Sequence, residues 1–231
     1  MRGQTFGKVV QMAREEAGQS SNAAVGRNVT DIFEQFVRRT YERLHQDFDW
    51  LHLFRRDDKI LEAGKRFYGF PDELDPDRLA GVYVLEEKGF HWREVTYGVG
   101  PAEWNRYDPR QDERSDPVRA WERTGQGFIE VWPLPESPQT LRFEGMPVPS
   151  PLAQRQDVVD LDANLVALFA AGEWLAKQGA NDTQMKLQQA QQLYERLKGH
   201  QQQASPTFQM NTIRRGDAQR GHQIVVRAPR T

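Results

Sequence analysis

Two histidines and two aspartates lie between His45 and His52, and side chains of these types can bind a metal ion or transfer protons. On a helix, Asp49 would be a neighbour of both histidines, because residues three and four positions apart share one helix face. Phe48 and Leu51, however, belong to the apolar stripe of the same helix, and this turns both aspartates largely toward solvent. Exposed pairs of this kind are common on helices, so the pattern favours neither a metal site nor catalysis.

A second group of acidic side chains lies in the segment Tyr107–Pro117. A hard cation such as calcium would need several of their oxygens to converge on one point. Arg110 and Arg114 alternate with the acids and partly neutralise them, and the spacing is not that of an EF-hand. We interpret the segment as a solvated or inter-subunit salt-bridge loop. Its acids are Asp108, Asp112, Glu113 and Asp116.

The chain also has six tryptophans and several glutamates on or beside expected strands, a combination that could indicate carbohydrate cleavage. Glycosidases use two carboxylates about 5–10 Å apart. No spacing in the sequence places two of these glutamates across a cleft, and tryptophans at strand edges more often pack or line a protein interface. The glutamates in question are Glu86, Glu87, Glu94 and Glu130.

The absence of cysteine excludes disulfides, thiolate metal sites and cysteine nucleophiles. Phosphate-binding loops, dinucleotide fingerprints, zinc-protease motifs and nucleophile elbows are also absent from the sequence. We therefore expect no catalytic residue, no cofactor and no metal ion, and we interpret the protein as a non-enzyme.

Charge is distributed unevenly along the 231 residues, of which 38% are hydrophobic and 28% charged. The net charge is -2, but the residues after Lys198 contain five Arg and one Asp, a charge of +4, which leaves -6 on the preceding part. An acidic body with a basic tail indicates two different contact surfaces, and a nucleic-acid reader would itself have a basic folded face. No apolar run approaches the roughly 18 residues of a membrane helix, so we expect no membrane partner.

Helical periodicity is concentrated at the two ends of the chain. The sequence predicts helices over Thr5–Ala17 and from Asn28 or Thr30 to Leu51, then one from Asp160 or Asp162 to Gly179 and one from Asp182 to Gly199. Their apolar stripes can be buried only against one another. The predicted fold is α+β: an amphipathic bundle of two N-terminal and two C-terminal helices, a β-hairpin-rich middle insertion and an extended C-terminal tail. The expected boundaries are 1–56, 57–151, 152–199 and 200–231.

Within the middle region, Val82–Leu85 and Phe90–Val95 form a predicted hairpin. The segment Gly98–Arg123 is expected to be an ordered excursion pinned by aromatic residues, without regular structure. Two further strand segments, Phe128–Trp132 and Thr140–Phe143, are separated by three prolines in six residues.

Proline cannot donate to a strand ladder, so this corner is not an ordinary tight hairpin turn. We expect it to hold a β-unit rigidly away from the helices, with three aromatic side chains against a neighbouring chain. They are Phe128, Trp132 and Phe143.

The C-terminal tail allows two functional interpretations besides a purely solubilising role. Its arginines could bind phosphates electrostatically, or Gln223–Ala228 could add a strand to the sheet edge of a protein partner. The apolar residues of that hexamer favour a protein partner, because an electrostatic arm would not need them. The residues concerned are Arg214, Arg215, Arg220, Ile224, Val225, Val226, Arg227 and Arg230.

The order of elements resembles that of the head-to-tail adaptor, or connector, proteins of tailed bacteriophages. The resemblance covers most of residues 1–198, although the aromatic excursion is longer than that region usually is, and the basic tail has no strict counterpart. It is carried by DFDWL (Asp47–Leu51), FYGFPDEL (Phe67–Leu74), IEVWPLP (Ile129–Pro135), LRFEG (Leu141–Gly145), the aspartate-entered helix DLDANLVALFAAGEWLA (Asp160–Ala176) and YERL (Tyr194–Leu197).

This resemblance implies a structural virion protein at the portal–tail junction, assembled in the host cytoplasm. Its copies would form a ring, twelvefold by expectation, that docks on the portal through the tail residues named above and offers its lower face to tail or nozzle proteins. DNA would pass through the lumen without specific binding, which an acidic body favours. Two alternatives stay open: a nucleic-acid-binding accessory protein acting through the arginine-rich tail, and a polysaccharide-binding or polysaccharide-cleaving phage protein.

Overall fold

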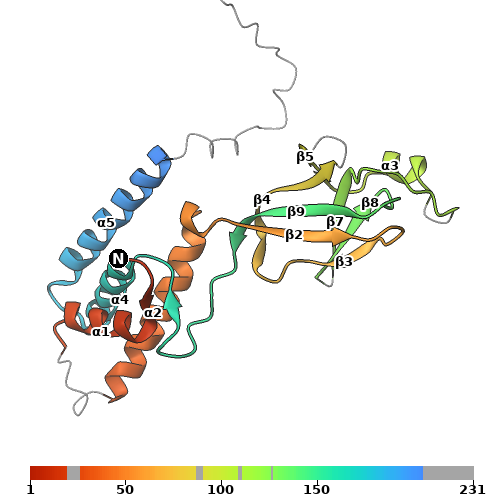
Figure 1. Ribbon diagram of the computed structural model, residues 1–231. Helices are drawn as coiled ribbons and strands as arrows, with labels where there is room; N and C mark the ends of the chain where they lie inside the picture. The colour runs from red at the N-terminus through yellow and green to blue at the C-terminus, as the bar shows by residue number, and fades with distance from the viewer. Residues whose placement is uncertain (20–26, 87–90, 109–110, 126, 205–231) are drawn as a thin grey trace, which may run out of the picture.

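The computed structural model describes residues 1–19, 27–86, 91–108, 111–125 and 127–204, which form a helical part and a β part at opposite ends of an elongated molecule (Figure 1). The helical part is built from both ends of the chain, and the β part is built from the middle. This confirms the predicted α+β fold, in which the terminal helices pack together and the sheets lie between them in sequence. The predicted tail lies almost wholly outside the described residues.

The helical part consists of α1 (Phe6–Glu16), α2 (Arg27–Asp47), α4 (Ala163–Gln178) and α5 (Thr183–Ala204). α4 is its centre, because it contacts α1, α2 and α5. Burial on α4 was predicted for a wide apolar face, and this is confirmed at Leu165, Val166 and Trp174, whereas Leu168 and Phe169 are only partly buried and Ala176 is exposed. Small side chains are buried as well, because a helix enclosed on several sides allows close approach where its residues are small. The buried set is Ala163, Leu165, Val166, Ala167, Ala170, Ala171, Gly172 and Trp174.

Local capping signals set most of the helix ends. The Thr5 hydroxyl accepts a hydrogen bond from the Lys8 amide at 3.4 Å, and the Asp162 carboxylate accepts bonds from the first amides of α4 at 3.0 and 3.2 Å. Gly179 ends α4 with φ at +66°, a conformation that glycine adopts without strain. Gly199, in contrast, does not end α5 as predicted. One glycine inside a helix costs only about 1 kcal/mol, and the glutamines and alanine that follow it favour helix.

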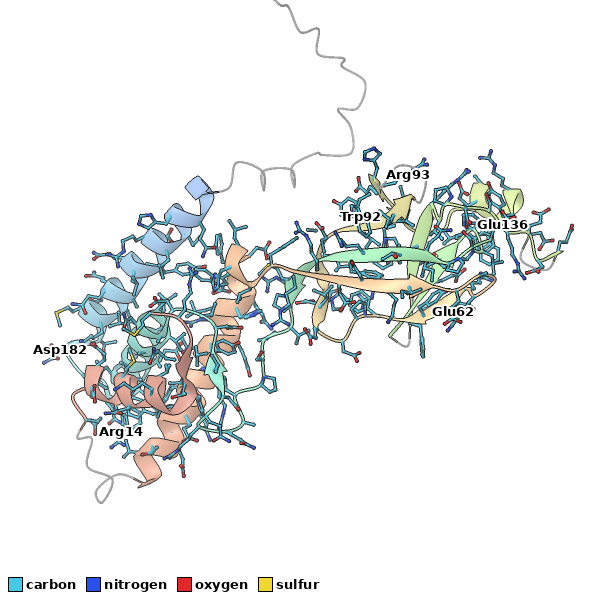
Figure 2. All side chains as sticks on the ribbon, in the orientation of Figure 1. Arg14, Glu62, Trp92, Arg93, Glu136 and Asp182 are labelled. Carbon is cyan, nitrogen blue, oxygen red and sulfur yellow. The ribbon has the colours of Figure 1, made fainter. Side chains whose placement is uncertain are left out.

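Two four-stranded sheets make up the β part. The first has the strand order β2 (Arg55–Leu61), β9 (Gln139–Pro147), β4 (Leu74–Glu86) and β5 (His91–Glu94); the second has β3 (Phe67–Gly69), β8 (Phe128–Trp132), β7 (Ala120–Thr124) and β6 (Thr96–Tyr97). The predicted hairpin is β4 with β5, paired antiparallel. Side chains fill the interior of each part (Figure 2). The β core is made of Leu61, Tyr68, Leu74, Val82, Val84, Val95, Val118, Trp121, Ile129, Val131, Leu141 and Phe143.

The segment expected to lack regular structure contains both a short helix, α3 (Pro101–Arg106), and the strand β7. α3 starts at a proline, whose fixed φ suits the first helical position, and the α3 segment lies against the second sheet through Trp104 and Glu103. Aromatic contacts hold this segment in place, as expected, but the segment contains a helix and a strand.

The proline corner carries the chain from the second sheet to the first. β8 and β9, which flank it, do not pair with each other but belong to different sheets. The Asp116 carboxylate holds the corner by accepting hydrogen bonds from the amides of Glu136 and Ser137, at 2.9 and 3.0 Å, and from the Ser137 hydroxyl at 2.6 Å. The rigid corner therefore joins two layers of one β part, which explains why an ordinary hairpin turn would not serve there.

β2 leaves the helical part and β9 returns to it, and the two strands pair from Arg55 opposite Gly145 to Leu61 opposite Gln139 (Figure 1). Arg78 of β4 links the two parts at the same place. Its guanidinium donates to the carbonyl oxygens of His45 and Phe48, at 2.7 and 3.0 Å, and to the Asp49 carboxylate at 2.6 Å. A cation at the carboxyl end of α2 also compensates the helix dipole.

Replacing Arg78 tests this link. We expect Arg78→Ala to lower the free energy of unfolding by about 2 kcal/mol, since it removes charge-assisted bonds to helix-end carbonyls. Arg55→Ala is the matched control, because Arg55 pairs with Glu73 at an exposed position and should contribute less than about 1 kcal/mol. Chemical denaturation measures both variants, and equal losses would contradict the assigned role of Arg78.

Burial of His45 makes stability depend on pH. The His45 ring is fully buried, and burial lowers its pKa below the ordinary 6.5; Asp160 opposes this shift and Arg78 reinforces it. The unfolded chain therefore binds a proton that the folded chain does not, so stability is complete above pH 6.5 and falls as the pH drops below it. We expect His45→Leu to flatten this fall in denaturation measured across a pH series, and an equally steep fall would contradict the prediction.

Candidate protein interface

The structure separates the three aromatic residues that were expected to contact a neighbouring chain. Phe128 is 48% exposed, whereas Trp132 and Phe143 are fully buried within the chain itself. Their rings cannot reach a neighbour in this conformation, so the surface role is restricted to Phe128. The predicted tail residues, from Arg214 to Arg230, lie outside the described residues.

The alternation of β8 accounts for this separation. Ile129 and Val131 point into the core between the sheets, so Phe128 and Trp132 share the outer face. α3 then covers one end of that face: the Trp104 ring lies 4.7 Å from the Trp132 ring, centroid to centroid, and the Trp132 Nε1 donates to the Glu103 carbonyl at 3.0 Å.

Phe143 is buried for a different reason. It belongs to β9 and faces the space between the two sheets, where its ring lies 5.6 Å from that of Phe70 and 5.7 Å from that of Trp121. Burial of this residue stabilises the sandwich. The sequence did not reveal it, because the crossing from one sheet to the other decides which side of the returning strand is inward.

Two residues that the sequence analysis did not select join Phe128 at the surface. Phe67 of β3 is 49% exposed and Trp104 of α3 is 41% exposed, and we call these three residues the outer aromatic face. Phe67, Thr124, Gly125 and Phe128 line an open hollow of about 590 Å³. The pairing of Gly69 with Phe128 places Phe67 diagonally across from Phe128, a register that no local pattern in the sequence predicts.

Arg66 holds the outer aromatic face together. Its guanidinium carbon lies 4.6 Å from the Trp104 ring centroid, 4.9 Å from that of Trp132 and 5.2 Å from that of Phe67. The Nε atom donates to the Glu130 carboxylate at 2.7 Å. This arrangement combines cation–π contacts with an ion pair, so the exposed rings are preorganised for contact with another molecule.

The histidine–aspartate group does not form a site. His45 is buried, the Nε2 atom of His52 lies 3.0 Å from the Asp160 carbonyl, and Asp49 is paired with Arg78. Burial also lowers the pKa of His52. Across the described ranges, no three His, Asp or Glu side chains are grouped so that they could hold a metal ion. None of the helices in those ranges has the length and apolar character that crossing a membrane requires.

Three of the other acidic candidates have partners within the chain. Asp116 binds the proline corner, Asp112 pairs with Arg114 at 2.6 Å, and Glu130 pairs with Arg66. These carboxylates are used within the chain and do not converge on a cleft. Among the described residues, the outer aromatic face is the candidate for a contact with another molecule, because exposed aromatic side chains are enriched at protein interfaces.

Comparison with protein-family models gives a match over residues 4–216 to the model described as SU10 adaptor protein. The chain belongs to the SU10 adaptor protein family. The match spans the helical part, the β part and the first residues beyond α5. None of the curated proteins matches the chain.

Family membership confirms the resemblance to phage adaptor proteins. It indicates a structural rather than enzymatic role, a location in the virion and binding to other virion proteins.

The cover that α3 provides can be tested by mutation. We expect Trp104→Ala to lower the free energy of unfolding by about 1–2 kcal/mol in chemical denaturation, because it removes the ring that covers Trp132. Phe128→Ala, a truncation on the same face without a covering role, should change stability by less than about 0.5 kcal/mol. Equal stability losses in the two variants would contradict the assigned contact.

Proposed function

We propose that copies of this protein form a ring below the portal and connect the portal to tail or nozzle proteins, with a central passage for DNA. The single observation that carries this proposal is the family match over residues 4–216. A ring of twelve copies is the expected symmetry. The fold is compatible with it, because contacts between unlike surfaces of identical chains close into rings.

The division of the molecule into two parts supports this proposal. Glu136, in the proline corner, lies at the end of the β part far from the helices, and Asp182, before α5, lies at the opposite end of the molecule (Figure 2). An elongated subunit whose two ends lie far apart can bridge one assembly to the next. The outer aromatic face is the proposed contact of the β part with a neighbouring copy or with the next ring.

Charge supports the remaining parts of the proposal. The residues up to Lys198 carry a net charge of -6, which disfavours retention of DNA in a lumen. The basic tail, with Arg214, Arg215, Arg220 and Arg230, is the proposed arm toward the portal. The tail lies outside the described residues, so its role rests on its sequence.

Electron microscopy of the protein mixed with purified portal tests the proposed function. We expect stacked rings in which the adaptor ring has the symmetry imposed by the portal, even if the protein alone is monomeric. A protein that ignores portal assemblies would contradict the proposal.

The contribution of the outer aromatic face can be measured in the same assay. We expect Phe128→Asp to weaken ring assembly at least about tenfold, because a carboxylate would be buried in the contact. Val158→Asp is the matched control: Val158 is 54% exposed in the helical part, so the substitution adds the same charge far from the face. Equal assembly by the two variants would show that Phe128 does not belong to the ring contact.

A further inference from the structure

The β sandwich is open along one side, where β4 and β7 are each paired over only part of their length. β5 pairs with β4 only at Tyr83–Glu86, so between Leu74 and Gly81 β4 has a described strand neighbour only in β9. β6 pairs with just the first two residues of β7, so Glu122–Thr124 have a described strand neighbour only in β8. Edges of this kind present backbone groups that another strand can pair with.

Both open edges border one groove of about 640 Å³. Its floor is apolar, with Val82 and Trp121 buried and Leu79 partly buried. Tyr97 stands at its side, 58% exposed, with its ring 5.0 Å from that of Trp121. The groove therefore offers what an added strand requires: backbone edges for hydrogen bonds and an apolar surface for alternate side chains.

Acidic side chains at the rim of the groove favour a positively charged side chain in the bound strand. Asp77 and Glu94 line it, and Arg123 reaches across from β7 to pair with Asp77 at 2.9 Å. No ion pair of Glu94 occurs within the described residues. An incoming guanidinium could pair with Glu94 without displacing Arg123.

We propose that this groove binds residues Gln223–Ala228 of a second copy of the chain, as an added β-strand. The hexamer QIVVRA matches the groove in pattern, because Ile224 and Val226 would fall on the same side of a strand and Arg227 on the other. It matches in charge as well, since the tail carries +4 and the preceding part carries -6.

The tail is long enough to reach the groove of a second copy. The 18 residues between Ala204 and Gln223 can span up to about 60 Å when extended, and α5 ends in the helical part while β4 and β7 lie in the β part (Figure 1). A tail-to-groove contact joins unlike surfaces, so each copy would hold the next around a ring. The inference thus rests on the proposed ring, and it adds the contact that links the copies.

The groove changes the expected destination of the hexamer. From the sequence alone, Ile224, Val225, Val226 and Arg227 were expected at the portal, but the groove supplies an acceptor edge within this family member itself. Arg214, Arg215 and Arg220 precede the hexamer and remain assigned to the portal.

Cross-linking between two full-length chains tests the proposal, and the absence of native cysteine makes single-cysteine variants unambiguous. One chain carries Thr96→Cys, at an exposed position on the groove, and the other carries Val225→Cys in the tail. A short bis-maleimide is added to the concentrated mixture, and mass spectrometry identifies peptides that join residues 96 and 225. Met185→Cys, which replaces the groove variant on exposed α5, is the control.

We expect the 96–225 link between copies at least about tenfold above the 185–225 control, because docking raises the effective concentration of the two thiols. Ile224→Asp in the tail chain should abolish this excess, and Gln209→Asp, with the same charge change outside the hexamer, should retain it. Neither substitution touches the described fold, so loss of folding cannot explain the result.

Three outcomes would overturn the proposal. A chain with both cysteines that links 96 to 225 only within itself at high dilution would make its own tail the occupant. Cross-links from Val225→Cys to the portal alone, in the portal–adaptor complex, would show that the hexamer binds the portal and not the groove. No link above control in any mixture would leave the groove without this ligand, while ring formation on the portal would still support the proposed function.

Discussion

The helices at the two ends of the chain can bury their apolar faces only against each other, and the rest of the structure depends on this constraint. Phe33 of α2 packs against Trp174 of α4, with 4.8 Å between ring centroids, and Phe6 of α1 is fully buried in the same core. Because residues so far apart in sequence must meet, the middle of the chain has to leave and return at one place. β2 and β9 do this as a paired antiparallel ladder, and Arg78 ties the start of the β part to the end of α2.

This constraint divides the molecule into one part whose core is complete and one part whose edges are not. The helical core is closed by helices from both termini, with their ends capped by Thr5, Asp162 and Gly179. The β part has a closed core between its sheets, but it keeps the outer aromatic face and an open side beside β4 and β7. A stable base that carries an unsatisfied β part is a suitable building block for an adaptor of the SU10 family.

The sequence predicted what local patterns determine. The start of α1 near Thr5, the start of α4 at one of two aspartates, which the structure shows to be Asp162, and the stop at Gly179 follow from helix periodicity and end chemistry. It did not predict features that depend on pairing between distant segments. Trp132 is buried because α3 covers it, and Phe143 is buried because the proline corner changes sheets, whereas Phe128 is exposed. Phe67 and Trp104 were missed for the same reason, since only the strand register and the position of α3 bring them beside Phe128.

Hydrogen exchange on the free protein and on the portal-bound assembly tests most directly whether other chains complete the β part. We expect amides in α1, α2 and α4 to have the same protection in both states, because their core is already closed. Amides of β4 between Arg78 and Gly81 and of β7 between Glu122 and Thr124 should gain protection on assembly, since an added strand would cover them. New protection confined to the helices, with both strand edges unchanged, would show that other chains do not complete the β part.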